Sequence, residues 1–223
     1  MLSYPFMQNA FVVGTLIAIV SGFIGVFVVA RHMSFLAHTL SEIGFAGASF
    51  GLFMGWSPLI GMLIFTILAS TTIGELGMQE KRSESLISAV SAVAIGLGIA
   101  FLALSQKNAS AATSILFGSI FSISHANVVQ VVVLALIVLV VGLLCYRPLR
   151  HFAFDYNTAI FSLKHVVLIE VLFLVLMAMT VAISSQVVGS LLIFILITLP
   201  ASAAMRWGRT VWQMVGLSVL FGV

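Results

Sequence analysis

Charged residues are scarce in this 223-residue sequence: Asp, Glu, Lys and Arg make up 7% of it, against roughly 25% in an average soluble domain. Hydrophobic residues make up 62%. These proportions exclude a soluble fold and predict a protein that lies in a membrane. The net charge of +3 comes from nine basic residues spread over short segments, so it does not indicate a nucleic-acid-binding patch.

A scarcity of cysteine and the absence of a phosphate-binding pattern limit the functions that the chain can have. Cys145 is the single cysteine, so the chain cannot form an intrachain disulfide, and we expect this residue to belong to the core. The phosphate-binding pattern G-x-x-x-x-G-K-[ST] does not occur in the sequence. Any ATP hydrolysis that drives this protein must therefore be carried out by another subunit, and the chain itself is predicted not to be an enzyme.

Long apolar stretches are what the sequence has in abundance. A helix needs about 20 residues to cross a bilayer, and seven stretches satisfy this: 6–30, 34–53, 57–75, 85–104, 126–146, 166–184 and 187–205. An eighth begins near Thr210 and reaches Val223 after about 14 residues, short of a full span. We therefore expect an all-α polytopic membrane protein in which 1–223 is one transmembrane domain, incomplete at its C-terminus.

Basic residues predict how these spans are oriented. If Arg31 is cytoplasmic, strict alternation places every other Lys and Arg except Lys107 on the same side, as the positive-inside rule requires. This arrangement puts the N-terminus outside. The segment 111–124 is too short and too polar to span, so we expect it to be a short external helix, either interfacial or re-entrant.

His38 and Glu42 form the most informative polar pair. They stand four residues apart in an apolar stretch, and side chains at this spacing are neighbours on one face of a helix. Ionisable groups at bilayer depth are costly and usually line a pathway or a site. An imidazole and a carboxylate can bind one metal ion together, which makes the pair a candidate metal site. The alternative is a hydrogen-bonded pair that only fastens two helices.

Glycines occupy the other side of the same stretch. Gly47, Gly51 and Gly55 recur at every fourth residue and, at about 100° per residue, point roughly away from His38 and Glu42. Such a series lets a neighbouring helix approach closely. The same residues also contain a literal G-x-S-x-G around Ser49, but the nucleophile motif of that form needs a turn between a strand and a helix. An intramembrane hydrolase is therefore disfavoured.

The predicted cytoplasmic segment 147–165 is the longest soluble-looking connection in the chain. Asp155 and Asn157 precede a short apolar run, as helix N-caps do. A short helix lying against the membrane there would suit a docking surface for a soluble partner. An ordinary connecting loop is the alternative.

Four segments together resemble the ABC-type divalent-metal permeases, which import zinc, manganese or iron. Residues 31–51 (RHMSFLAHTLSEIGFAGASFG) are similar to the metal-site helix of this family, and SILFGSIFSIS from Ser114 is similar to its external segment. FDYNTAIFSL from Phe154 resembles its ATPase-coupling loop, and VVGSLLIFILITLPASAA from Val187 resembles its late proline-containing helix. The four occur in the order of the family and extend over nearly the whole chain.

The resemblance implies a bacterial plasma-membrane permease with three partners: a second permease copy, a cytoplasmic ATP-binding subunit and an extracytoplasmic metal-binding lipoprotein. It implies that His38 and Glu42 are metal ligands and that Asp155, Asn157, Ala159 and Leu163 contact the ATPase. Many members of the family carry an Asp followed by a His where this chain has His38 and Glu42, so the ligand types are kept in reversed order.

Zinc is the expected cargo because it accepts nitrogen and oxygen ligands, whereas manganese favours more oxygen. We expect no permanently bound cofactor. The alternative function is an ion-coupled secondary transporter in which His38 and Glu42 relay protons or ions.

Overall fold

The structure is a computed structural model that describes residues 5–76, 84–105, 115–118, 125–155, 158, 166–190 and 192–223. Within these ranges the chain is helical, with short turns and no strand, which confirms the predicted all-α class. The helices are α1 (Pro5–Ala30), α2 (Ser34–Met54), α3 (Pro58–Leu76), α4 (Glu84–Leu104), α6 (His125–Leu144), α7 (Tyr146–Phe154), α9 (Val166–Val188), α10 (Ile193–Trp207) and α11 (Val211–Gly222).

Three of these helices are long and apolar enough to cross a membrane: Met7–Ala30 in α1, Ile87–Leu104 in α4 and Val166–Val188 in α9. A fourth span results if the bent pair α6 and α7 is taken as one. The helix α2 is not among them because His38, Glu42 and its serines lower its hydropathy. The structure thus supports a polytopic helical protein, and within the described ranges it does not confirm the predicted count of seven spans.

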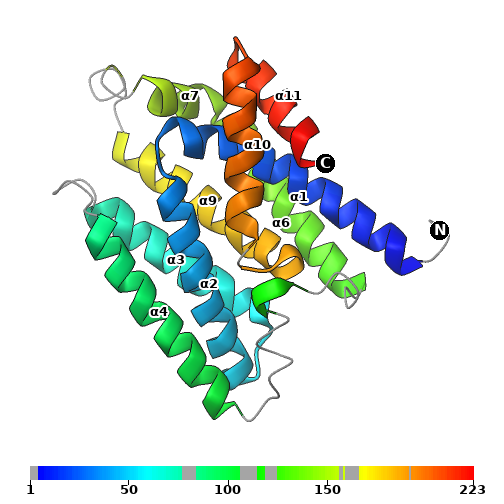
Figure 1. Cartoon of the computed structure of the whole chain (residues 1–223), viewed down its shortest axis with the longest axis vertical. Helices are drawn as coiled ribbons and strands as arrows, with labels where there is room; N and C mark the ends of the chain where they lie inside the picture. Colours follow the sequence, from blue (N-terminus) through cyan, green and yellow to red (C-terminus); the bar gives the residue numbers. More distant parts are fainter. Residues whose placement is uncertain are drawn as a thin grey trace.

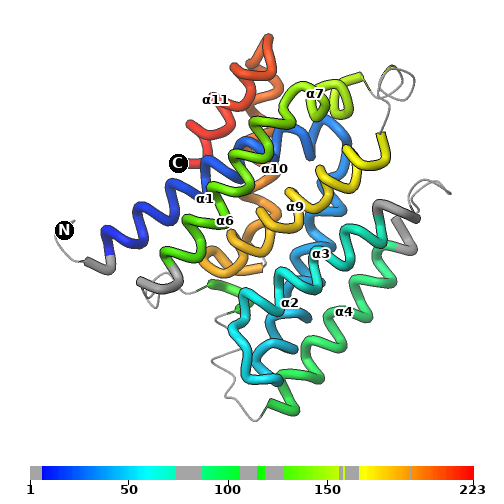
Figure 2. The backbone as a smooth tube through the Cα atoms, turned by 180° about the vertical axis from the view of Figure 1, so that it is seen from behind, coloured from blue at the N-terminus to red at the C-terminus, as the bar shows by residue number. Residues whose placement is uncertain are grey.

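The helices pack in two groups that α9 joins (Figure 1). One group contains α2, α3 and α4, and the other contains α1, α10 and α11. Seen from behind, α9 runs between them and contacts α3 on one side and α1 on the other (Figure 2). Fully buried Phe27, Phe173 and Leu174 form part of the main apolar core where α1 and α9 meet.

The late apolar stretch 187–205 is not one helix, which corrects the predicted span. The helix α9 continues to Val188, and α10 begins only at Ile193. Gly189 separates them with a φ of 93°, a left-handed backbone conformation that glycine adopts without the steric penalty of other residues. The chain therefore turns back within the bundle, and α10 is a helix of 15 residues.

The predicted long loop after 146 begins with a helix that sequence reasoning missed. The nine-residue helix α7 follows α6 with a bend of 74°. Its apolar side chains Leu149 and Phe152 are buried, while Arg147 and Arg150 are exposed. An amphipathic helix of this kind lies along one end of the bundle, as Figure 1 shows.

Two aromatic contacts join α7 to other turns at the same end of the bundle. The guanidinium of Arg31, at the α1–α2 turn, lies 4.5 Å from the centre of the Phe152 ring. Tyr146 stacks on Trp212 of α11 with 4.5 Å between ring centres. The turns that follow α1, α6 and α10 therefore lie together.

Candidate metal site on helix α2

Both predicted metal ligands lie on α2, which begins at Ser34. Most side chains of α2 are buried by α3, α4, α9 and α10. In its first three turns, Phe35, His38 and Glu42 are partly exposed, with 37% of the His38 side chain and 22% of the Glu42 side chain accessible. Their spacing of three and four residues places them on one face. The pair therefore occupies a stripe of α2 that the chain leaves partly uncovered.

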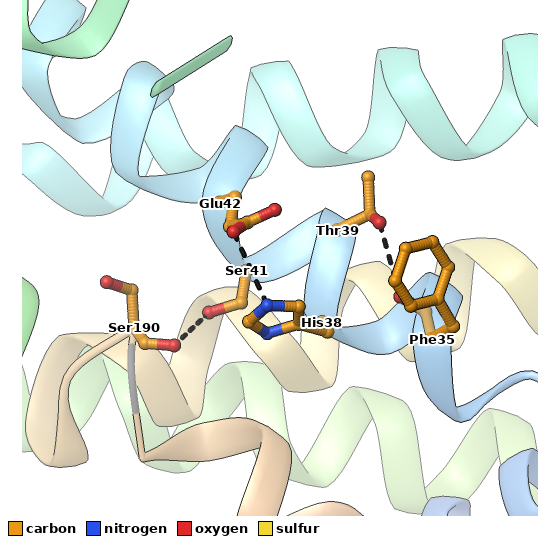
Figure 3. A network of polar contacts seen from close by, with 6 residues as sticks. All are labelled: Phe35, His38, Thr39, Ser41, Glu42 and Ser190. Carbon is orange, nitrogen blue, oxygen red and sulfur yellow. Dashed lines mark hydrogen bonds and ion pairs between the residues drawn. The ribbon is translucent and has the colours of Figure 1, made fainter. Parts of the chain in front are cut away.

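The two side chains point toward one another (Figure 3). The His38 Nε2 atom lies 3.4 Å from Glu42 Oε1, close enough for an ion pair when the imidazole is protonated. The Nδ1 atom of His38 is buried and has no hydrogen-bond partner within the described part of the chain. One ring nitrogen thus faces the carboxylate, and the other forms no hydrogen bond with the described residues.

Residues from the α9–α10 turn and from α10 hold this part of α2. The Phe194 ring meets the His38 ring edge to face, with 5.3 Å between centres. One residue before Glu42, the Ser41 hydroxyl donates to the main-chain carbonyl of Ser190 (Figure 3). The pair is therefore flanked by two contacts to one neighbouring segment.

His38 and Glu42 supply only two ligands. No group of three or more His, Cys, Asp or Glu side chains suited to a metal ion occurs in the ranges described above. Structural zinc sites hold four protein ligands, and catalytic ones hold three plus water. The pair by itself therefore provides fewer protein ligands than either kind of zinc site.

Gly47 and Gly51 face α3. A Cβ atom on Gly47 would collide with the carbonyl oxygen of Gly61, and one on Gly61 would collide with the carbonyl oxygen of Gly47. At Gly51 an added Cβ would lie 3.1 Å from the Ser57 carbonyl oxygen. The backbones of α2 and α3 are therefore in direct contact on the side of α2 away from the pair.

Gly55, the third glycine of the series, has a different role. It ends α2 in a left-handed conformation with φ of 77°, and no atom lies within 4 Å of where its Cβ would be. Glycine is common at this position because it adopts positive φ easily. Gly55 is thus a helix cap and not a packing residue, which corrects the prediction.

Ser49 is not placed as a nucleophile. Its side chain is fully buried inside α2, and its hydroxyl donates to the Phe45 carbonyl at 2.8 Å. The continuous helix lacks the strand-to-helix turn that the G-x-S-x-G motif requires.

Among the four predicted coupling residues, the structure describes Asp155, whereas Asn157, Ala159 and Leu163 lie outside the described residues. Asp155 is exposed at the end of α7, and its Oδ1 accepts a hydrogen bond from the Thr158 amide at 3.3 Å. A side-chain oxygen that bonds the amide three residues on has the geometry of a helix N-cap. His38 and Glu42 lie on α2, whereas Asp155 lies at the end of α7.

Sequence reasoning missed Ser41, Ser190 and Phe194 as neighbours of the pair. The position of Ser41 directly before Glu42 could have indicated a hydrogen bond near the pair, because a buried hydroxyl in an apolar helix needs a partner. The identity of that partner could not be read from the sequence, since Ser190 is 149 residues away.

Comparison with known proteins identifies a family that matches nearly the whole chain. Residues 3–223 match the model of the ABC 3 transport family. The chain is 28% identical over 225 residues to the manganese import system permease protein ScaB of Streptococcus parasanguinis, covering 98% of this chain and 78% of that protein. It is 24% identical over 221 residues to the high-affinity zinc uptake system membrane protein ZnuB of Haemophilus influenzae, covering 99% and 85% respectively.

A solved structure shares the fold. PsaBC from Streptococcus pneumoniae, in complex with Fab, matches with a TM-score of 0.88 and 24% identity, over 99% of this chain and 79% of that one. The sequence match and the helical fold agree with the predictions of a multi-pass plasma-membrane protein and of a transporter subunit that leaves ATP hydrolysis to another chain. The chain belongs to the ABC 3 transport family, and its resemblance to the ABC-type divalent-metal permeases is thereby confirmed.

Proposed function

We propose that this chain is the permease subunit of an ABC importer for divalent metal ions, with His38 and Glu42 as ligands on the transport path and zinc as the preferred cargo. The observation that carries the proposal is the approach of His38 Nε2 and Glu42 Oε1 to 3.4 Å on a partly exposed stripe of a helix that is otherwise buried. Family relatives include both a manganese permease and a zinc permease, so the preference for zinc rests on the ligands.

The distance between the two ligand atoms supports zinc. Two ligands that each bind a tetrahedral zinc at about 2.0 to 2.2 Å are about 3.3 to 3.6 Å apart. Adjacent ligands of an octahedral ion at the same bond lengths are only about 2.8 to 3.1 Å apart. The separation of 3.4 Å lies within the tetrahedral range.

The remaining ligands come from outside the pair. A second permease copy can contribute its own His38 and Glu42, or water can complete the shell while the ion passes. We propose a complex of two permease copies, a cytoplasmic ATP-binding subunit and an extracytoplasmic metal-binding lipoprotein. Because the chain has no phosphate-binding loop, the ATP-binding subunit is needed for transport.

We further propose that Asp155 lies at the contact with the ATP-binding subunit, together with Asn157, Ala159 and Leu163. The support is the exposed position of Asp155 and the hydrogen bond that its Oδ1 accepts from the Thr158 amide. The exposed Arg147 and Arg150 of α7 precede it on the same connection.

The proposed topology places the N-terminus outside and the C-terminal ends of α1, α6 and α10 on the cytoplasmic side. It is supported by the basic residues: Arg31, Arg150 and Arg209 follow α1, α6 and α10, whose ends are joined by the aromatic contacts of α7. Such clustering on one side is typical of a cytoplasmic face.

Cysteine labelling tests this topology. In a Cys145→Ser background, Trp56→Cys at the exposed α2–α3 turn should react with a membrane-impermeant maleimide added to intact cells. Arg150→Cys should react only after the membrane is opened. Reaction of both cysteines from the same side would overturn the orientation.

Transport itself tests the function. We expect proteoliposomes that contain the full complex to take up radioactive zinc only when ATP is supplied to the ATP-binding subunits, with manganese uptake slower at equal concentration. A proton gradient alone should drive no uptake. Uptake driven by the gradient without ATP would favour the ion-coupled secondary transporter instead, and faster manganese uptake would overturn the preference for zinc.

A further inference from the structure

The main-chain amide and carbonyl of Ser190 form hydrogen bonds to two different segments. Its amide donates a hydrogen bond to the Ile115 carbonyl at 3.3 Å, and its own carbonyl accepts the hydroxyl proton of Ser41. Ile115 belongs to segment 115–118, and Ser41 belongs to α2 beside Glu42. One residue in the α9–α10 turn therefore connects segment 115–118 with the helix that carries the metal pair.

Paired glycines bring segment 115–118 against this turn. Gly118 and Gly189 both have positive φ, 77° and 93°. A Cβ atom on Gly118 would collide with the Val187 carbonyl oxygen, and one on Gly189 would collide with the Leu116 carbonyl oxygen. The two backbones are thus in contact at a place where a side chain has no room. Segment 115–118 therefore cannot move toward the α9–α10 turn without displacing it.

The Ser41 hydroxyl is used differently from the other buried hydroxyls of α2. Thr39 donates to Phe35 and Ser49 donates to Phe45, each to the carbonyl four residues earlier in the same helix. Hydroxyls in helices commonly make this local bond. Ser41 instead reaches out of the helix to Ser190, so its hydrogen bond depends on where the turn lies.

The same turn also leads into the contact with His38. Phe194 is four residues after Ser190, and its ring packs on the imidazole. Thus the hydrogen bond at Ser41 and the ring contact at His38 both fix α2 relative to one short stretch of chain. A shift of that stretch would therefore alter one contact of His38 and one contact of the residue before Glu42.

We propose that Ser190 and Ser41 are positioning residues for the metal pair, and that their hydrogen bond transmits the position of segment 115–118 to His38 and Glu42. The proposal rests on the proposed function, since it assumes that the pair binds a divalent cation. Under the proposed topology, segment 115–118 approaches the turn from the extracytoplasmic side. Delivery of an ion there would then be coupled to the geometry of the ligands.

Cobalt binding to the purified complex of permease and ATP-binding subunits, without the metal-binding lipoprotein, tests the proposal, because the visible absorption of Co²⁺ reports the geometry of its ligands. Ser41→Ala should weaken Co²⁺ binding roughly threefold to tenfold, the range expected from the loss of one hydrogen bond between membrane helices. The visible bands should also change in intensity or position. The matched control is Ser49→Ala, which removes a buried hydroxyl from the same helix but only its local bond.

Ser49→Ala should leave both the affinity and the spectrum near those of the unaltered complex, and both variants should reach the membrane in equal amounts. If Ser41→Ala behaves as Ser49→Ala does, the proposal is wrong. Glu42→Gln separates this failure from failure of the proposed function. Co²⁺ binding that survives Glu42→Gln would refute the metal site itself, whereas loss with Glu42→Gln and no effect of Ser41→Ala would refute only the positioning role.

Discussion

Glu42→Gln and His38→Ala should each reduce zinc uptake by at least about tenfold, because partners outside the coordination shell already cost about 10- to 100-fold when removed, and these residues are proposed to be ligands themselves. Gln keeps the size of the side chain and its ability to form a hydrogen bond, but it removes the charge. Ala at position 38 removes both ring nitrogens. The measurement is the initial rate of ATP-driven zinc uptake, normalised to the amount of permease in the membrane.

The alternative role of the pair predicts a different pattern. If the pair only fastens helices, Gln preserves much of the contact, since hydrogen bonds between membrane helices average only about 0.6 kcal/mol. Uptake by Glu42→Gln would then be almost normal. Phe35→Leu is the control, because Phe35 shares the partly exposed stripe but offers no ligand atom. Near-normal rates for zinc and manganese in Glu42→Gln would remove the pair from the transport path.

Asp155→Arg is expected to stop uptake without preventing insertion. The change removes the carboxylate oxygen that accepts the Thr158 amide hydrogen bond. It also reverses the charge of an exposed side chain at the proposed contact with the ATP-binding subunit. Because Asp155 is exposed, the bundle should still fold. The expected result is lost zinc uptake, with ATP hydrolysis no longer coupled to transport.

Asp155→Asn is the matched control, since Asn caps a helix about as well as Asp does. This variant should keep most of the uptake of the unaltered complex. If Asp155→Arg transports at the normal rate, the loop has no part in coupling. If Asp155→Asn fails as completely as Asp155→Arg does, the negative charge matters and the cap does not.

Helix positions were predictable because long apolar runs and the polar turns between them determine where a chain can cross a membrane. The observed α2, Ser34–Met54, differs by one residue from the predicted 34–53, and α4, Glu84–Leu104, differs by one from 85–104. The break at Gly189 was not predictable in the same way. Hydropathy placed the break after residue 184, whereas α9 continues to Val188, because the position of the break depends on a backbone angle that hydropathy does not report.

The short helix α7 was missed for another reason. Nine residues that mix apolar and basic side chains are too short and too polar to be predicted as a span. Tyr146 was counted with the preceding stretch. The His38–Glu42 pair was visible because its members are close in sequence. Its surroundings were not, because Ser190 and Phe194 reach α2 only through the fold.

The reciprocal contact of Gly47 and Gly61 limits how the transporter can move. The carbonyl oxygen of each glycine occupies the space that a Cβ atom on the other would need. The helix α2 therefore cannot turn about its own axis while it stays against α3. A rotation that swung the ligand pair from one side of the membrane toward the other would force the two backbones apart. We therefore expect alternating access to move α2 and α3 together as one body relative to α9, which contacts both helices.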